Sequence, residues 1–270
     1  ANVDVLDGAV IEGLADQTSV GSITIIAQRE DVASAEILSA AGSLGIAVSG
    51  TYTKVENRGS ANVNLGRVDG AASTLRGGVV SVNVGDRTSA SAQSITAQGA
   101  GFAAGAGAFA IANNASNSTL NLDRVRIYGD SLIQLNNINS GTASSTALGE
   151  ALAGGGAIVV SRATSDLSAT LVTDLNASAI TAARVEILTQ ITSERGDNVR
   201  SDAQTLTLAG ALAGSGAESE AYTAYSVTTN VGGGADNVVA TSINATAGAL
   251  VLRTGTGGID GVVSRAIASG

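Results

Sequence analysis

The 270-residue chain contains no cysteine, histidine, proline, methionine or tryptophan, and its only aromatic residues are four Tyr and two Phe. Without Cys and His it has no thiolate nucleophile, no imidazole base and none of the usual ligand sets for zinc, copper or iron. A serine triad lacks its base for the same reason, and no disulfide can form. These absences exclude the common nucleophilic and transition-metal classes of enzyme.

Charge is also scarce. Only 14% of residues are charged, against about 25% in an ordinary globular domain. The formal net charge of −9 opposes nucleic acids and anionic membranes as partners. The most apolar run, residues 99–112, is shorter than the ~20 residues that a membrane-spanning helix needs, so we predict no membrane insertion by this segment. Residues 1–10 do not resemble a signal peptide, and we expect the chain to be a segment of a longer protein.

What the chain does contain is small and aliphatic. Hydrophobic residues make up 44% of the sequence, mainly Ala, Val, Ile and Leu, and there are 35 Gly. This composition is too apolar for a disordered chain. It is too poor in Pro, and its Gly too aperiodic, for collagen. Small and β-branched side chains in these amounts favour thin, regular β layers over a bulky aromatic core.

An internal repeat organises these residues. Strand-like segments begin at positions 23, 79, 132, 185 and 250, which are 53 to 65 residues apart. After each of the first four come a polar stretch, an Ala/Gly-rich run, a second strand-like piece and a short connector. This order predicts four repeats of about 55 residues between two partial ones. The predicted boundaries are 1–20 (partial), 21–76, 77–129, 130–182, 183–247 and 248–270 (partial).

We predict an all-β fold, a parallel β-helix or β-solenoid. Strands of five or six residues imply two or three coils in each repeat, with ~18–27 residues per coil, on the order of 10–15 coils and a rod roughly 50–70 Å long. A β-sandwich is the alternative, but it predicts Pro, aromatic core anchors and no long repeat. The Ala/Gly runs have two interpretations, a tightly packed interior or a face that adheres to another molecule.

The repeated strands, Ala/Gly runs and Asn- and Thr-rich turns, together with the absence of Cys, Pro and His, resemble the repetitive passenger regions of large bacterial exoproteins. These are the filamentous-haemagglutinin-like and leukotoxin-type adhesins of Gram-negative bacteria. The resemblance covers essentially the whole chain and rests on the composition and period of the repeats. It implies a right-handed parallel β-helix, export across two membranes, an extracellular location at the bacterial cell surface, and a role as a surface fibre or adhesive stalk.

Arg195, Gly196 and Asp197 spell a tripeptide that many cell-adhesion ligands present to integrins. They directly follow a strand-like segment, in a polar stretch that we expect to be an exposed loop. In a receptor complex the Asp would coordinate a receptor-held cation and the Arg would meet acidic groups. The alternative is an ordinary solvated loop, because these stretches consist of charged residues and Gly in any case.

Two further motifs are weaker. The Gly-Asp sequences at 232–237 and 257–261 distantly resemble calcium-binding nonapeptides, but they lack tandem copies, and ordinary turns explain them better; we assign no cofactor, with calcium as the one alternative. Four Asn residues begin N-x-S/T sequons and are candidate glycosylation sites, although Asn can also form hydrogen-bonded ladders between coils. They are Asn114, Asn117, Asn176 and Asn244.

An enzyme on a β-helix would need paired carboxylates at a groove and aromatic residues to stack sugars. The acidic residues here recur singly near expected turns, and four Tyr are too few for a sugar groove; we keep a polysaccharide-active enzyme as a minor alternative. The sequence favours a non-catalytic adhesin rod whose partner is a receptor on a host or neighbouring cell. The second interpretation is a self-assembling filament, sheath or surface layer. The acidic residues in question are Asp123, Asp130, Asp166, Asp174 and Asp202.

Overall fold

The computed structural model describes residues 1–5, 8–13, 21–67, 69–192, 198–232, 241–257 and 262–269. These residues form strands and tight turns, and they include no helix that could span a lipid bilayer. The predicted all-β class is confirmed. The strands are β1 (Asn2–Val5), β2 (Val10–Glu12), β3 (Ser22–Ser43), β4 (Ile46–Gly66), β5 (Ser73–Ala100), β6 (Ala103–Asp123), β7 (Val125–Ala153), β8 (Gly156–Asn176), β9 (Ala179–Thr192), β10 (Val199–Ala209), β11 (Leu212–Val231), β12 (Ser242–Gly257) and β13 (Val262–Ser269).

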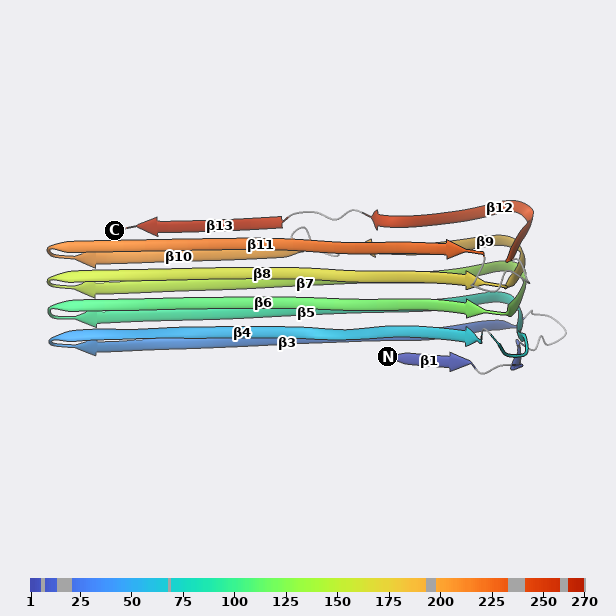
Figure 1. Cartoon of the computed structure of the whole chain (residues 1–270), viewed down its shortest axis with the longest axis horizontal. Helices are drawn as coiled ribbons and strands as arrows, with labels where there is room; N and C mark the ends of the chain where they lie inside the picture. Colours follow the sequence, from blue (N-terminus) through green and yellow to red (C-terminus); the bar gives the residue numbers. More distant parts are fainter. Residues whose placement is uncertain are drawn as a thin grey trace.

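The strands form two parallel sheets that lie face to face. The front sheet has the order β1-β4-β6-β8-β11. The back sheet has eight strands, which are β2, β3, β5, β7, β9, β10, β12 and β13. From β3 to β9 successive strands alternate between the sheets, so the chain winds as a coil whose turns stack on one another (Figure 1). This arrangement agrees with the predicted parallel β-solenoid.

The register gives the length of a coil. In the front sheet Ile46 pairs with Ala103, Ala103 with Gly156, and Gly156 with Leu212, which are steps of 57, 53 and 56 residues. One coil therefore takes up a whole repeat. The expectation of two or three coils per repeat was wrong, and so was the rod of 10–15 coils. The five-stranded front sheet extends only about 20 Å along the stacking direction.

The reason for the long coil lies in the polar stretches that we expected to be loops. Residues 29–34, 85–90 and 139–144 lie inside β3, β5 and β7 and not between strands. Their alternate side chains point between the two sheets, where they find polar partners, so the chain stays extended through them. Segments that resemble separate short strands in the sequence are the ends of strands of 21 to 29 residues.

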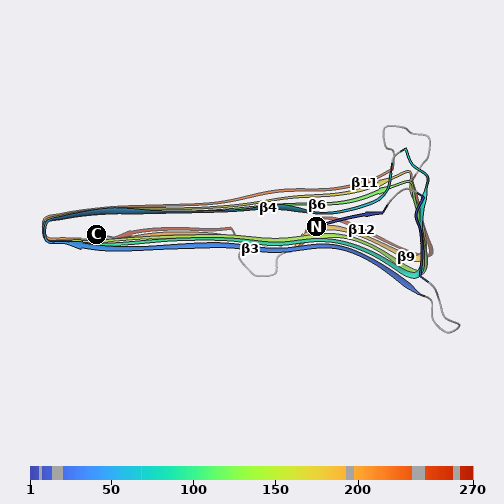
Figure 2. The same cartoon turned by 90° about the horizontal axis from the view of Figure 1, so that it is seen from below.

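In cross-section each coil is a long, narrow wedge (Figure 2). At one end the chain reverses tightly from the back sheet to the front sheet; we call this the narrow end. At the other end the sheets diverge and a short third side closes the coil. Shifts in register between Gly77 and Val79 and between Tyr128 and Leu132 mark the corner where this side meets the back sheet.

The side chains inside the wedge match its changing width. Large aliphatic side chains fill the wide end, where Leu65, Leu122 and Ile187 are fully buried. Toward the narrow end the interior residues are mainly Ala, with buried Ser and Thr among them, because the two sheets approach too closely for most longer side chains. These buried alanines are Ala90, Ala92, Ala104, Ala106, Ala108, Ala110, Ala112, Ala147, Ala151, Ala153, Ala157, Ala163 and Ala203. The interior packing expected of the Ala/Gly runs is therefore present.

The turn at the narrow end accounts for several glycines. Gly101, Gly154 and Gly210 occupy the same place in three successive coils. A Cβ on any of them would collide with the carbonyl oxygen of the residue stacked beneath it, which is Leu44, Gly101 or Gly154 respectively. Only glycine lets the backbones stack at this turn.

Candidate functional site

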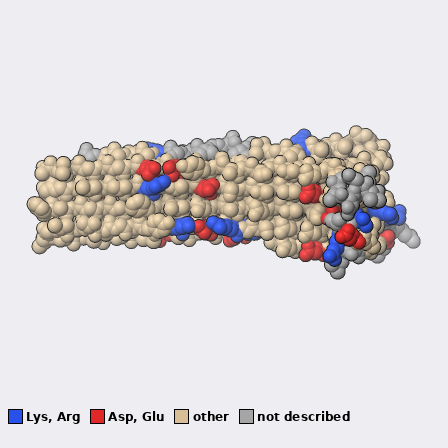
Figure 3. All heavy atoms as spheres, in the orientation of Figure 1, with Lys and Arg blue, Asp and Glu red and all other residues tan. Residues whose placement is uncertain are grey.

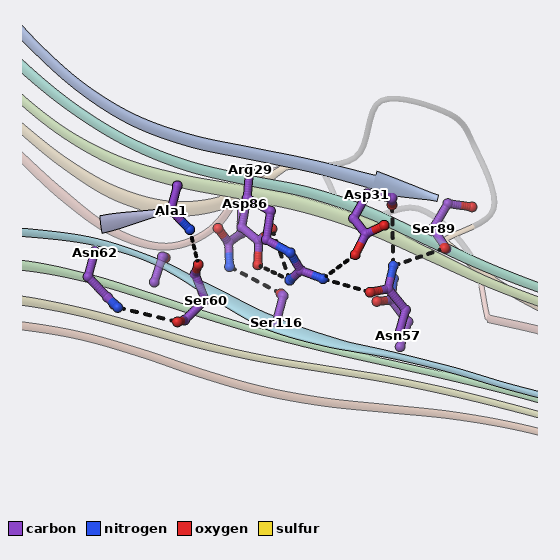
Figure 4. A network of polar contacts seen from close by, with 12 residues as sticks. Ala1, Arg29, Asp31, Asn57, Ser60, Asn62, Asp86, Ser89 and Ser116 are labelled. Carbon is purple, nitrogen blue, oxygen red and sulfur yellow. Dashed lines mark hydrogen bonds and ion pairs between the residues drawn. The ribbon is translucent and has the colours of Figure 1, made fainter. Parts of the chain in front are cut away.

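A polar network lies between the two sheets, midway along the coil (Figure 4). The Arg29 guanidinium donates to Asn57 Oδ1 at 2.6 Å and to Asp31 Oδ2 at 2.8 Å, and it lies 3.3 Å from Asp86 Oδ2. Gly59 makes room for it, since a Cβ there would collide with the guanidinium. The network ties β3 and β5 to β4 across the interior.

Asp86 is the most perturbed group in this network. Its carboxylate is fully buried, and burial raises the pKa of Asp86 from 3.8 to about 6, although the Arg29 cation opposes the rise. The opposition is limited because Arg29 makes its shorter contacts to Asp31 and Asn57. The network can hold coils in register, and it contains a proton-binding group that titrates near pH 6.

A second set of polar contacts runs along the stack on the outside. Asn64 Nδ2 donates to Asp4 at 2.7 Å, and Asn230 Nδ2 donates to Asp174 at 2.6 Å. In each pair the two residues are register partners in adjacent strands of the front sheet. Such side-chain ladders add inter-coil hydrogen bonds to those of the backbone. Asp174, one of the five acidic residues considered above for catalysis, belongs to such a ladder.

The remaining four acids are dispersed. Asp123 is buried and accepts from Asn176, Asp202 lies 3.6 Å from Arg200, and Asp130 and Asp166 are exposed. Within the described part of the chain, no group of three or more Asp or Glu side chains could hold a metal ion. Among the five acids, Asp123 and Asp174 join neighbouring coils, and the five lie at separate places along the strands.

The four sequon asparagines lie in different environments. Asn114 is 1% exposed, and its side chain points between the sheets and donates to the Thr142 carbonyl. The folded chain has no space for a sugar there. Asn176 is half-buried and donates to Asp123 at 3.1 Å, as expected of an inter-coil ladder. Asn117 and Asn244 are exposed on strands, and they remain candidate glycosylation sites.

Arg195, Gly196 and Asp197 lie outside the described residues, as do most of the two Gly-Asp sequences at 232–237 and 257–261. The register on either side of the tripeptide is described. Asn139 of β7 pairs with Ile191, and Ala143 pairs with Val199. Residues 192–198 thus correspond to residues 140–142 of the preceding coil, so the tripeptide belongs to an interval that is longer than its counterpart.

Two shallow grooves lie on the outer face of the back sheet, on either side of Arg87. One has a volume of about 230 Å³ and includes Gly85 and Ile138; the other, of about 380 Å³, includes Glu30 and Gly141. Both are open to solvent and are bordered by a mixture of polar and aliphatic side chains. They offer a surface for weak polar contact and no enclosed pocket.

The most distinctive surface is the narrow end. We define the apolar edge as residues 37–52, 94–109, 147–160 and 203–216, which contain a single charged residue, Glu150. Figure 3 shows no charged atoms over this end of the front sheet. Its exposed large apolar side chains are Ile37, Leu38, Leu44, Ile46, Val48, Tyr52, Phe102, Phe109, Leu152, Ile158, Val160, Leu206, Leu208 and Leu212.

Our sequence analysis did not identify this edge. Small and large apolar residues alternate there, so the pattern does not reveal which set faces inward. The signal that could have identified it is the lack of charge, which recurs at the same place in four successive coils.

No family model, no curated protein and no solved structure matches this chain.

Proposed function

We propose that this chain is a non-catalytic segment of an extracellular rod, the stalk or passenger of a large bacterial adhesin. The observation that carries the proposal is the parallel register of the long strands β4, β6, β8 and β11, which continues from coil to coil without a shift. A stack of this kind extends along one axis and can hold one end at a distance from the other, because each coil contacts chiefly its neighbours. The interior supports the same role, since it is filled by side chains.

Composition supports an exported, structural protein. A chain without Cys cannot form wrong disulfides during export, and hydrogen bonds between coils take the place of disulfides in joining the coils. The grooves on the back sheet are shallow. Glu30 and Asp31 lie together at one of them, but Asp31 is ion-paired with Arg29, which favours a structural role over polysaccharide hydrolysis.

An adhesive function would reside in segments that differ between coils. The interval containing Arg195 and Asp197 is longer than its counterpart in the preceding coil, and insertions of this kind are where repeat proteins place their binding residues. We therefore propose this interval as the receptor contact of the rod.

The test is binding of the purified chain to cells that display receptors for the tripeptide. We expect the Arg195→Ala, Asp197→Ala variant to lose most of this binding. The matched control, Arg162→Ala with Asp166→Ala, removes the same residue types from exposed positions of β8 and should retain it. Equal binding by both variants would refute the receptor contact. Blades with the cross-section of Figure 2 in electron micrographs, single or associated, would support the rod itself.

A further inference from the structure

We propose that the apolar edge is a self-association surface, on which a second copy of this chain packs with its front sheet against the back sheet of the first. This inference goes beyond the proposed rod and does not depend on it. It would join rods side by side.

The first argument is the extent of uncharged surface. At the tip, Leu44 is 99% exposed in the first coil, Phe102 is 68% exposed in the next coil, and Leu212 is 69% exposed in the fourth coil. About six residues on each of four strands make a face of about 400 Å² on each sheet. Each face therefore has the size that is usual for the largest apolar patch of a monomer, about 300–600 Å², and such patches often have a function.

The second argument is shape. The back sheet carries a groove of about 600 Å³ at this end, which has Ala40, Ala97 and Gly99 along its floor and Leu152 and Leu208 at its side. Small residues form the floor because they occupy the outward positions of β3 and β5. At the position of Gly42 and Gly99, β7 and β10 carry Leu152 and Leu208; at the position of Ala40 and Ala97, they carry Glu150 and Leu206. The groove is open and mainly apolar, and Glu150 is the one charged residue that lines it.

The front sheet presents the opposite relief. Val48, Gly105, Ile158 and Gly214 are register partners in four successive coils, so large side chains alternate with gaps. Val48 is 77% exposed and Ile158 is 60% exposed. Their side chains project from a glycine floor and match the groove of the back sheet in character and scale.

The third argument distinguishes a protein partner from a lipid one. Within the described residues β3 pairs only with β5, and β11 pairs only with β8. Both strands pass through the apolar edge with one row of unpaired N–H and C=O groups. Such open edges are not tolerated in hydrocarbon, whereas face-to-face packing of sheets leaves them in water. The net charge of −9 also makes copies repel one another. This repulsion is weakest at the apolar edge, where Glu150 is the single charged residue.

The mode of growth follows from the geometry. The two complementary faces lie on opposite sides of the blade, so each copy can contact two others, and the contact is heterologous and does not close. About 400 Å² per partner is half of a standard interface, so we expect weak, concentration-dependent association that continues into larger oligomers.

The experiment is sedimentation velocity over a roughly hundredfold range of concentration. Wild type should progress from monomer to a series of oligomers. Ile158→Glu on the front sheet and Leu208→Glu on the back sheet should each raise the required concentration by at least about tenfold, because each buries a carboxylate. The control Thr170→Glu makes the same charge change at an exposed position of β8 outside the edge, and it should behave as wild type.

Mixing the two blocked variants distinguishes this arrangement from others. Ile158→Glu retains its back-sheet groove and Leu208→Glu retains its front-sheet ridge, so the mixture should form heterodimers and nothing larger. Glu150→Gln removes the charge beside the groove and should strengthen association of the otherwise unchanged chain.

Three results would overturn the proposal. Wild type could stay monomeric throughout the range, and flotation with neutral phosphatidylcholine vesicles would then show whether the edge binds lipid instead. Leu208→Glu could associate as wild type does, which would indicate contact between two front sheets. Thr170→Glu could block association as strongly as the edge variants, which would indicate a general charge effect. Circular dichroism of each variant confirms that the fold is retained.

Discussion

Asp86 provides a quantitative test of the interior network. Its pKa is raised from 3.8 to about 6 in the folded chain because its carboxylate is buried. Between pH 3.8 and about pH 6, the folded state therefore keeps a proton on Asp86 that the unfolded state releases. The stability from this proton is complete below pH 3.8 and is lost as the pH rises through about 6. For these two pKa values the loss between pH 4.5 and pH 7.5 is about 2 kcal/mol.

Asp86→Asn removes this titration while it keeps the size and polarity of the side chain. The free energy of unfolding of wild type minus that of the variant should fall by about 2 kcal/mol from pH 4.5 to pH 7.5. Urea unfolding at both pH values measures it. The comparison must use the difference in unfolding free energy between wild type and variant. Other carboxyls act in the opposite direction on the pH dependence of wild-type stability. A hydrogen bond from Gln134, for example, lowers the pKa of Glu186.

The competing account is that the Arg29 ion pair stabilises the ionised carboxylate. In that case the difference would stay constant or would grow with pH, and either result would refute the reasoning. Repeating the comparison in an Arg29→Met background separates the two causes. Without the cation, burial is unopposed, so the pH-dependent difference should become larger than in the Arg29 protein.

Three further predictions test the packing and the surface. Leu122→Ala empties a fully buried site in the wide end and should lower the free energy of unfolding in urea by roughly 2–5 kcal/mol. Ala110→Leu overfills the narrow interior and should cost about 1–3 kcal/mol, whereas Ala115→Leu, at an outward position of the same strand, should change stability by less than about 0.5 kcal/mol; equal effects would contradict the assigned orientation. In a host that glycosylates Asn, any sugar detected by intact mass should disappear when Asn117→Gln and Asn244→Gln are combined, and it should be unchanged by Asn114→Gln.

The repeat was visible in the sequence because aliphatic segments recur at matching positions of the coil. Val79 pairs with Leu132, and Val185 pairs with Leu250; all four begin strand-like segments in our sequence analysis. What the sequence could not give was the number of coils per repeat. Arg29 and its interior partners interrupt the alternation of apolar residues, and such an interruption is read as a loop. Their pairing arises between strands that are remote in the sequence.

The apolar edge was hidden for a different reason. Alternation identifies a strand face when one side is polar, but here inward Ala106 alternates with outward Gly105 and Gly107, and inward Ala157 with outward Ile158. Neither set is polar, so only the register between coils shows that large side chains gather on the outside. The candidate tripeptide at 195–197 lies outside the described residues and stays a prediction.

The backbone hydrogen bonds between coils point along the stacking axis, and this direction determines how the protein responds to tension. A force along the axis acts directly on the bonds between two coils, so the coil at the end of the stack is released before those within it. Each coil contributes about 4.8 Å of folded height. Its 53 to 57 residues span on the order of 180 Å when pulled straight. A tether built this way lengthens in large steps under load and shortens again as each coil finds its neighbour.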